Sequence, residues 1–490
     1  MEGDVSIVMT DNEKKLHEQA YEEVEKKRHI DKIDPYRQIF HVMPPTGLLN
    51  DPNGWIKWKG TYHLFYQWYP YDTTHGSKYW GHYSSKDLVT WKEEPIALAP
   101  SEWYEKNGCY SGSAVDNNGV LTLIYTGNVK DEEDRRDSYQ CVATSTDGTH
   151  FTKLGPVIES LPDGYTAHFR DPKVWKQGEL WYMVLGAQTV EEKGRVVLYT
   201  SKNLTDWEFK GAIAGAGIGG ITDFGYMWEC PDLFSLDSKD VLIISPQGLE
   251  QEGIHYQNKF QAGYFIGEVN LDNAIFHHGD FAELDHGFEF YAPQTTVDEN
   301  GRRLLTAWMG VPEQDEETQP TVTNGWLHCL TIPRELHIHE GRLWQTPVKE
   351  LQKLRHDQES ITQTLSASDL LTFGDLAETA MEFVLTGLEE IKGIFEWTFR
   401  NEARLIFNAA SHMLTLERRN TRTHLTEQRH VRIDSLKRLH VFMDASSLEI
   451  FINGGEAVMS ARYFPSPKDK SLTMRADEQV MISLDKWVLS

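Results

Sequence analysis

Three carboxylates in this chain lie in similar short motifs, each followed closely by proline. Asp51 lies in NDPNG, Asp171 in FRDP and Glu229 in WECPD. Two carboxylates can cleave a glycosidic bond when one is ionised and attacks or stabilises the sugar cation while the other holds a proton for the leaving oxygen. Any one of them alone would be a turn residue or a solvated charge, so chemistry is expected only if the three lie together.

A repeat of about 60 residues explains how carboxylates so far apart can meet. Strand-like aromatic and aliphatic segments begin at 61, 121, 180, 241 and 303. The motif positions before them, 51, 111, 171, 229 and 291, are spaced by 60, 60, 58 and 62 residues. A unit of this size that holds several strands fits a propeller blade, whose first strand lines the central channel. We therefore predict a five-bladed β-propeller over residues 38–340; the alternative is an irregular all-β domain with chance spacing.

The segments before and after the repeat have different sequence patterns from it. Residues 1–37 form an N-terminal extension whose charged stretch from 12 to 34 predicts one exposed helix. Residues 341–359 read as a linker with a short helix, and residues 360–490 contain alternating strands and turns that are typical of a β-sandwich. The predicted fold class is all-β, a five-bladed β-propeller followed by a C-terminal β-sandwich.

Composition narrows the classes of partner. The net charge of −26 argues against nucleic acid or an anionic membrane as a partner. No apolar run approaches the length of a membrane span, and the N-terminus does not resemble a secretory signal. We expect a cytoplasmic protein, a monomer or homodimer, whose partner is a small sugar or sugar phosphate.

Cofactor and metal signals are weak. The stretch from Gly215 to Gly220 matches GxGxxG but lies outside any strand–helix–strand unit, so a loop is expected there. The twenty histidines and four cysteines lack ligand spacing, and we predict no metal and no cofactor. We expect His168 and His328 to have structural roles.

The motifs LLNDPNG, FYQW, SGSA, FRDPKVW and WECPDLF, in this order, resemble those of glycoside hydrolase family 32. This family includes invertases, fructanases and sucrose-6-phosphate hydrolases, and the resemblance implies a propeller followed by a sandwich. It implies that Asp51 is the nucleophile, that Glu229 is the general acid/base, and that Asp171 holds fructosyl hydroxyls.

The same resemblance implies a set of substrate-binding residues. Arg170 would pair with Asp171 or a sugar hydroxyl, and Tyr110 and Trp308 would wall the pocket. For Gln67 and Trp308 the alternative is a buried polar group and a core aromatic. The implied substrate-binding residues are Asn50, Gln67, Trp80, Tyr110, Ser111, Arg170 and Trp308.

The segment YDTTHGSKYWGH bears on the substrate. Many invertases resemble one another in having Trp-Gly at this place, where this chain has His75-Gly76 followed by Lys78. A His and a Lys near the aglycone side could receive a phosphate on glucose. In this respect the chain is similar to the sucrose-6-phosphate hydrolases. Lys78 could instead be a solvated loop charge, and Lys78→Ala should raise KM for sucrose-6-phosphate more than for sucrose.

The predicted function is retaining hydrolysis of sucrose-6-phosphate, or of sucrose, through a fructosyl-enzyme intermediate. Alternatives are hydrolysis of fructo-oligosaccharides and transfer of the fructosyl group to another sugar. More distant are an inverting five-bladed arabinan or xylan hydrolase, whose carboxylates stand about 6.5–9.5 Å apart, and a sugar-binding propeller without catalysis.

Overall fold

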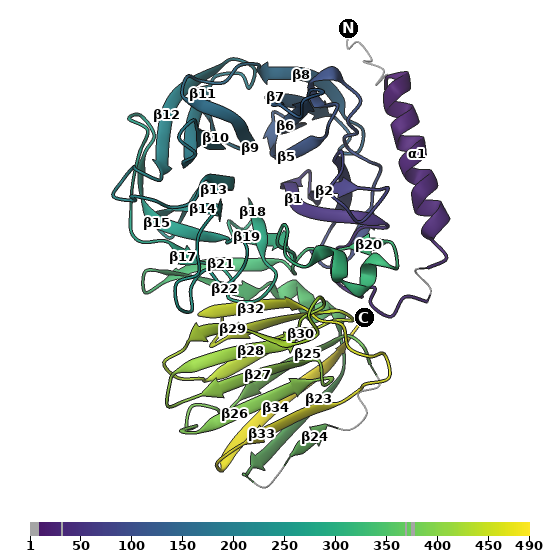
Figure 1. Cartoon of the computed structure of the whole chain (residues 1–490), viewed down its shortest axis with the longest axis vertical. Helices are drawn as coiled ribbons and strands as arrows, with labels where there is room; N and C mark the ends of the chain where they lie inside the picture. The colour runs from purple at the N-terminus through teal and green to yellow at the C-terminus, as the bar shows by residue number, and fades with distance from the viewer. Residues whose placement is uncertain (1–8, 31–32, 368–369, 374–377) are drawn as a thin grey trace.

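The computed structural model describes residues 9–30, 33–367, 370–373 and 378–490. Helix α1 (Asp11–Lys27) runs along one side of the N-terminal region (Figure 1). The hydroxyl of Thr10 caps it by accepting a hydrogen bond from the backbone N–H of Glu13 at 3.2 Å. The sequence predicted an exposed helix through residue 34; the helix ends earlier and buries one face, including His17 and Ala20.

In the described part of the chain the strands form seven sheets, so the protein is all-β as predicted. Five of the sheets follow one another along the N-terminal two thirds of the chain (Figure 1). The first contains β1 (Gly47–Trp58), β2 (Thr61–Tyr69), β3 (Tyr79–Ser85), β4 (Trp91–Glu93) and β20 (Trp326–Leu327). The second contains β5 (Cys109–Asn117), β6 (Val120–Lys130), β7 (Arg136–Ser145) and β8 (Thr152–Ile158). The third contains β9 (Tyr165–Gln177), β10 (Leu180–Thr189), β11 (Gly194–Ser201) and β12 (Trp207–Gly215).

The fourth and fifth sheets continue this order. The fourth contains β13 (Met227–Leu236), β14 (Lys239–Gln247), β15 (Gly263–Asn270), β16 (Ile275–His278) and β17 (Ala282–Glu283). The fifth contains β18 (Tyr291–Val297), β19 (Arg303–Trp308), β21 (Arg334–His339) and β22 (Arg342–Pro347). Because β22 completes the fifth sheet, the predicted linker over 341–359 begins too early.

The first strands of these five sheets contact one another in a cycle. Strand β1 contacts β5, β5 contacts β9, β9 contacts β13, β13 contacts β18, and β18 contacts β1. The second strands, such as β2 and β10, are buried along nearly their whole length. Each is covered on both faces by neighbouring sheets, which explains why the repeated segments read as continuous aromatic and aliphatic runs rather than as alternating patterns.

The C-terminal strands form two six-stranded sheets that share one apolar core. One has the order β23 (Arg355–Leu365), β34 (Val480–Leu489), β25 (Met381–Thr386), β30 (Arg438–Met443), β31 (Ser447–Ile452), β32 (Ala457–Arg462). The other has the order β24 (Leu371–Phe373), β33 (Leu472–Ala476), β26 (Ile394–Phe399), β27 (Ala403–Asn408), β28 (Met413–Arg419), β29 (Thr426–Arg432). Strand β23 lies at an edge and is mostly exposed; it begins within the predicted linker and ends within the predicted sandwich.

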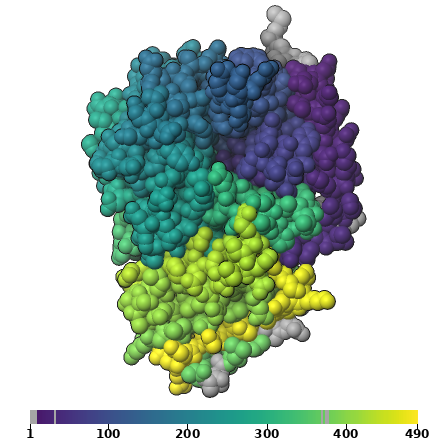
Figure 2. Space-filling model, viewed as in Figure 1, coloured from purple at the N-terminus to yellow at the C-terminus, as the bar shows by residue number. Residues whose placement is uncertain are grey.

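The C-terminal region packs directly against the N-terminal one (Figure 2), and a buried ionic cluster joins them. Arg334 bonds Glu449 at 2.6 Å and Asp285 at 3.1 Å, and all three side chains are fully buried. His41 bonds Asp444 at 2.7 Å and Glu449 at 3.0 Å. Buried charges persist only when they are paired and hydrogen-bonded, so this cluster fixes one relative placement of the two regions.

Candidate active site

A β-bulge interrupts each of the five first strands at its motif. The register shifts between residues 49 and 52, 109 and 112, 229 and 232, and 291 and 294, and β9 shifts at 170–173 against β10. Asp171, Cys230 and Ala292 have positive φ angles of 65°, 48° and 47°. A bulge redirects side chains, and non-glycine residues with positive φ are typical of functional sites. The bulges therefore turn the motif side chains out of the regular strand pattern.

Asp51 lies at the end of a directed hydrogen-bond network. Ser111 Oγ donates to its Oδ2, and Asn50 Nδ2 donates to its Oδ1 at 3.1 Å. Gln67 Nε2 donates to Ser111 Oγ at 2.6 Å, and Asn50 Nδ2 also donates to Gln67 Oε1 at 2.9 Å. Burial raises the pKa of Asp51 and the charge of Glu229 adds to this, while the bonds from Ser111 and Asn50 lower it. Both oxygens of Asp51 accept hydrogen bonds, which suits an ionised carboxylate.

Glu229 is held by four donated hydrogen bonds. Arg170 donates to its Oε1 from Nε at 3.0 Å and from Nη2 at 2.6 Å. Tyr291 Oη donates to its Oε2 at 2.6 Å, and Gln247 Nε2 donates to the same oxygen at 2.9 Å. The sequence predicted neither Tyr291 nor Gln247 as a site residue. Tyr291 could have been found, because position 291 belongs to the same repeat series as Asp51; Gln247 has no such signal.

Cys230 connects the three carboxylates. It follows Glu229 in the chain, its backbone N–H donates to Asp171 Oδ2 at 3.0 Å, and its thiol lies 3.6 Å from Asp51 Oδ2. Burial, together with the charges of Glu229 and Asp51, raises the pKa of Asp171 to about 7, against the effect of Arg170. The structure thus brings together the three carboxylates that the repeat predicted to be neighbours.

Arg170 does not bond Asp171, which was the protein partner predicted for it. Its hydrogen bonds go to Glu229 and to His168, and no hydrogen bond to Asp171 occurs among the described residues. Since a guanidinium only donates, His168 Nδ1 accepts from Arg170 Nη1 at 2.9 Å. Burial, then the cations of Arg170 and Arg136, lower the pKa of His168 to about 4, so this imidazole is neutral.

The predicted aromatic walls differ in exposure. Trp80 and Trp308 are 0% and 1% exposed and lie below the surface, whereas Tyr110 is half-buried. Trp80 donates its indole N–H to the carbonyl of Tyr110 at 3.0 Å, and Trp308 packs edge-on against Tyr291 at 6.0 Å and His75 at 6.1 Å. Trp80 and Trp308 therefore support residues that line the site rather than offering an exposed ring face themselves.

Lys78 is buried and is not a solvated loop charge. Its Nζ lies 3.1 Å from His75 Nδ1, and His75 Nε2 lies 3.1 Å from Glu316 Oε1. Glu316 also accepts a hydrogen bond from His328 Nε2 at 2.9 Å. Burial lowers the pKa of Lys78 to about 7, against the charges of Asp51 and Glu316. His75 and Lys78 thus belong to one hydrogen-bond network that also contains the carboxylate of Glu316.

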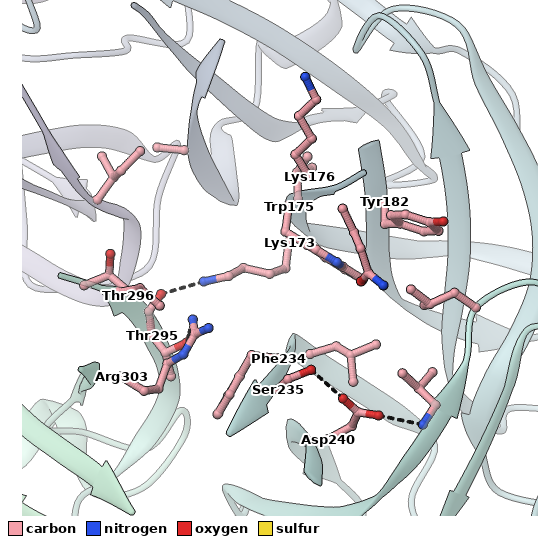
Figure 3. Close-up of a pocket in the computed structure, with 18 of the residues that line it drawn as sticks. Lys173, Trp175, Lys176, Tyr182, Phe234, Ser235, Asp240, Thr295, Thr296 and Arg303 are labelled. Carbon is pink, nitrogen blue, oxygen red and sulfur yellow. Dashed lines mark hydrogen bonds between the residues drawn. The ribbon is translucent and has the colours of Figure 1, made fainter. Parts of the chain in front are cut away.

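A cavity that is distinct from the carboxylate site lies farther along the same strands. It has a volume of about 660 Å³ and is lined by side chains that include Lys173, Phe234 and Arg303 (Figure 3). Lys173 Nζ bonds Thr295 O at 2.7 Å and Asp232 at 2.9 Å. Neither Asp51, Asp171 nor Glu229 lines this cavity.

Among the described residues, no group of three or more His, Cys, Asp or Glu side chains is arranged to hold a metal ion. Within the same residues, no helix combines the length and apolar character needed to cross a membrane.

Comparisons with known proteins agree with the motifs. The family model for the "Glycosyl hydrolases family 32 N-terminal domain" matches residues 41–347, and the model for the "Glycosyl hydrolases family 32 C terminal" matches residues 350–487. The sucrose-6-phosphate hydrolase of Bacillus subtilis is 52% identical over 483 residues, which cover 98% of this chain and 100% of that protein. The enzyme of the same name from Salmonella typhimurium is 48% identical over 440 residues, which cover 88% of this chain and 90% of that protein.

Solved structures share the whole fold. The sucrose-6-phosphate hydrolase of Lactobacillus gasseri has a TM-score of 0.86 at 32% identity, covering 97% of this chain and 99% of that chain. A variant of the Bombyx mori β-fructofuranosidase, in complex with sucrose, has a TM-score of 0.84 at 34% identity, covering 96% of this chain and 98% of that chain. With both of the family's domains matched along nearly its full length, this chain belongs to glycoside hydrolase family 32.

Proposed function

We propose that this chain is a retaining β-fructofuranosidase that hydrolyses sucrose-6-phosphate to fructose and glucose-6-phosphate. The observation that carries the proposal is that Asp51 and Glu229 come together at Cys230, which follows Glu229 in the chain and whose thiol lies 3.6 Å from Asp51 Oδ2. The substrate is supported by the 52% identity with the Bacillus subtilis sucrose-6-phosphate hydrolase.

In the first step, a carboxylate oxygen of Asp51 attacks the anomeric carbon of the fructosyl group as the bond to the glycosidic oxygen breaks. Glu229 gives its proton to that oxygen, so glucose-6-phosphate leaves as a neutral alcohol at the cleaved position. Arg170, Tyr291 and Gln247 donate hydrogen bonds to Glu229, and they stabilise the carboxylate that remains after the proton has gone.

In the second step, a water molecule attacks the fructosyl carbon bound to Asp51. Glu229 takes a proton from this water, the bond to Asp51 breaks, and fructose is released with both carboxyl groups restored. The fructosyl group is the same in sucrose and in its phosphate, so both substrates would pass through the same intermediate.

Asp171, Asn50, Gln67 and Ser111 would bind the fructosyl hydroxyls. Supporting this role, Asn50, Gln67 and Ser111 are already linked to Asp51 by hydrogen bonds, so they can hold a sugar and the nucleophile in one geometry. Tyr110 would contact the sugar, with Trp80 and Trp308 behind the pocket wall. His75 and Lys78 would lie on the glucose side.

We propose a five-bladed β-propeller and a β-sandwich for the two regions. The cyclic contacts among β1, β5, β9, β13 and β18 support the propeller, and the shared core of the two six-stranded sheets supports the sandwich. We place the boundaries at 38–347 and 355–490, with 348–354 as the linker and 1–37 as the N-terminal extension. A cytoplasmic location is consistent with a phosphorylated sugar as substrate, and the assembly would be a monomer or homodimer.

The proposed function is tested by comparing kcat/KM for sucrose-6-phosphate, sucrose and a fructo-oligosaccharide. We expect the highest value for sucrose-6-phosphate, with fructose as a product of each cleaved substrate. Preference for the fructo-oligosaccharide would contradict the proposed substrate. Product analysis at high sucrose concentration separates hydrolysis from transfer, because a transferase makes longer sugars in place of free fructose.

A further inference from the structure

We propose that Arg136, at the start of β7, binds the phosphate group of the substrate and so selects sucrose-6-phosphate over sucrose. This inference rests on the proposed function, and it assigns the recognition of phosphate to a residue outside the predicted phosphate contacts His75 and Lys78.

A phosphate group places specific demands on this protein. It carries close to two negative charges, whereas the chain has a net charge of −26, so binding needs a local cation whose charge is not already neutralised. Arginine suits this task because its planar fork can donate two hydrogen bonds to one phosphate. The cation must also face the glucose half, which lies on the side of Glu229, the proposed proton donor to the leaving oxygen.

The other cations near the carboxylates are already engaged. Arg170 donates two hydrogen bonds to Glu229 and a third to His168. Lys78 is 4% exposed and bonded to His75, which is bonded in turn to Glu316. A phosphate that approached His75 would meet the carboxylate of Glu316, and that repulsion opposes its binding.

Arg136 is in a different situation. Its guanidinium carbon lies 5.5 Å from the centre of the Tyr110 ring, and in the described part of the chain no carboxylate lies within ion-pair distance of it. It is half-buried, so its stem is held while part of the side chain faces solvent. A guanidinium stacked on an aromatic ring keeps its edge free to donate hydrogen bonds.

The neighbours of Arg136 place it at the proposed active site. Tyr110 precedes Ser111, whose hydroxyl donates to the carboxylate of Asp51. Arg136 also acts on the neighbouring His168, whose ring is bonded to the guanidinium that holds Glu229. Arg136 is therefore a cation without a protein counter-ion that stands on the side where the glucose half leaves.

The adjacent Arg135 provides a matched control. It is exposed and forms ion pairs with Asp131 at 2.6 Å and Glu133 at 2.9 Å. Arg135→Gln and Arg136→Gln make the same change of charge at neighbouring positions of one hairpin, so a general electrostatic effect would appear in both variants. Only the loss of a direct contact would appear in Arg136→Gln alone.

The experiment measures kcat/KM for sucrose-6-phosphate and for sucrose in wild type, Arg136→Gln and Arg135→Gln. For Arg136→Gln we expect a decrease of about 10- to 100-fold with sucrose-6-phosphate, the range of a charge-assisted hydrogen bond, and of less than about 3-fold with sucrose. Arg136→Lys should recover part of the loss, because it restores the charge without the fork. Arg135→Gln should leave the ratio of the two substrates unchanged.

A second measurement is independent of turnover of the phosphorylated substrate. Glucose-6-phosphate should inhibit sucrose hydrolysis by wild type, and its inhibition constant should rise about 10- to 100-fold in Arg136→Gln. Equal losses on both substrates in Arg136→Gln, or selective loss in His75→Gln or Lys78→Met but not in Arg136→Gln, would overturn the inference. A wild type that does not prefer sucrose-6-phosphate would instead overturn the proposed substrate, so the two failures are distinguishable.

Discussion

Tyr291 donates its phenolic hydrogen to Oε2 of Glu229 at 2.6 Å, although 62 residues separate them in the chain. Tyr291 is 1% exposed, and its burial, together with the charge of Glu229, raises its pKa well above the usual value. The phenol therefore stays protonated and donates its hydrogen to Glu229. It fixes one oxygen of Glu229 while Arg170 fixes the other, which leaves the carboxyl group little freedom to rotate.

Tyr291→Phe should lower kcat by about 10- to 100-fold with a smaller effect on KM, because the variant loses a hydrogen bond to the proposed proton donor but keeps its ring. Steady-state kinetics with sucrose test this. The control is Tyr264→Phe, which removes a buried hydroxyl bonded to Leu343 N at 3.0 Å, away from the carboxylates. A Tyr291→Phe enzyme with unchanged kcat would show that the phenol has only a structural role.

Asp171→Asn should stabilise the protein above neutral pH while lowering its activity. The pKa of Asp171 is about 7 in the folded state against an ordinary value of 3.8, so ionisation opposes folding. This cost is absent below pH of about 3.8, grows as the pH rises, and is complete above about 7. We expect the Tm of Asp171→Asn at pH 8 to exceed that of wild type by about 1–3 °C.

The comparison is made by thermal unfolding across pH 5–8, where the Tm difference between Asp171→Asn and wild type should grow with pH. Asp147→Asn serves as a control, because its Tm should be lower than that of wild type instead of higher. Although burial raises the pKa of Asp147, hydrogen bonds from the backbone of His150 and Thr149 lower it overall. A Tm difference for Asp171→Asn that shrinks with rising pH would contradict the account.

Arg422 of the C-terminal region should influence the glucose side of the site. It bonds Asp315 at 2.6 Å and Glu317 at 2.5 Å, the two residues that flank Glu316, and Glu316 bonds His75 at 3.1 Å. Arg422→Ala should therefore loosen the segment that holds His75 and raise KM for sucrose-6-phosphate by about 3- to 10-fold, with kcat nearly unchanged.

Arg475→Ala is the matched control for this prediction. Arg475 forms a similarly exposed, bidentate pair with Glu396 at 2.8 Å, but entirely within the C-terminal region. Its removal should change neither KM nor kcat. If both variants raise KM equally, the effect of Arg422 does not pass through the segment that contains Glu316.

The buried cluster between the two regions should dominate their joint stability. Arg334→Met leaves Glu449 and Asp285 without their shared cation, and breaking a buried pair in this way costs about 3–5 kcal/mol. Denaturant unfolding measures the loss. A variant as stable as wild type would mean that the cluster is not needed for stability.

His41 makes this junction sensitive to alkaline pH. Burial alone would lower the pKa of His41, but its bonds to Asp444 and Glu449 raise it to about 9. Since this value lies above the ordinary 6.5, the stabilisation is complete below about pH 6.5 and disappears as the pH rises through 9. His41→Gln should remove this loss between pH 7 and 9, as measured by unfolding at several pH values.

The ~60-residue spacing predicted correctly that Asp51, Asp171 and Glu229 lie together, because a repeated unit places equivalent residues at equivalent positions. Hydrogen-bond partners could not be predicted in the same way. Arg170 bonds Glu229 rather than Asp171, since the bulges in β9 and β13 redirect both side chains. Such bulges depend on the pairing of strands, which the spacing of motifs does not encode.

The burial of individual side chains could not be predicted from the sequence either. A solvated loop charge was one alternative for Lys78, yet this side chain is 4% exposed and bonded to His75, which bonds Glu316 far along the chain. The first half of the edge strand β23 and the last strand of the fifth sheet, β22, were predicted as linker because edge strands carry polar residues.

The central claim is that Asp51 is the nucleophile, and the turnover of Asp51→Ala tests it most directly. If Asp51 is the nucleophile, Asp51→Ala keeps the circular dichroism spectrum of wild type and its Tm falls by no more than about 3 °C. Its turnover of sucrose-6-phosphate then falls by at least about 10⁴-fold. Hydrolysis by folded Asp51→Ala at a rate close to that of wild type would contradict it.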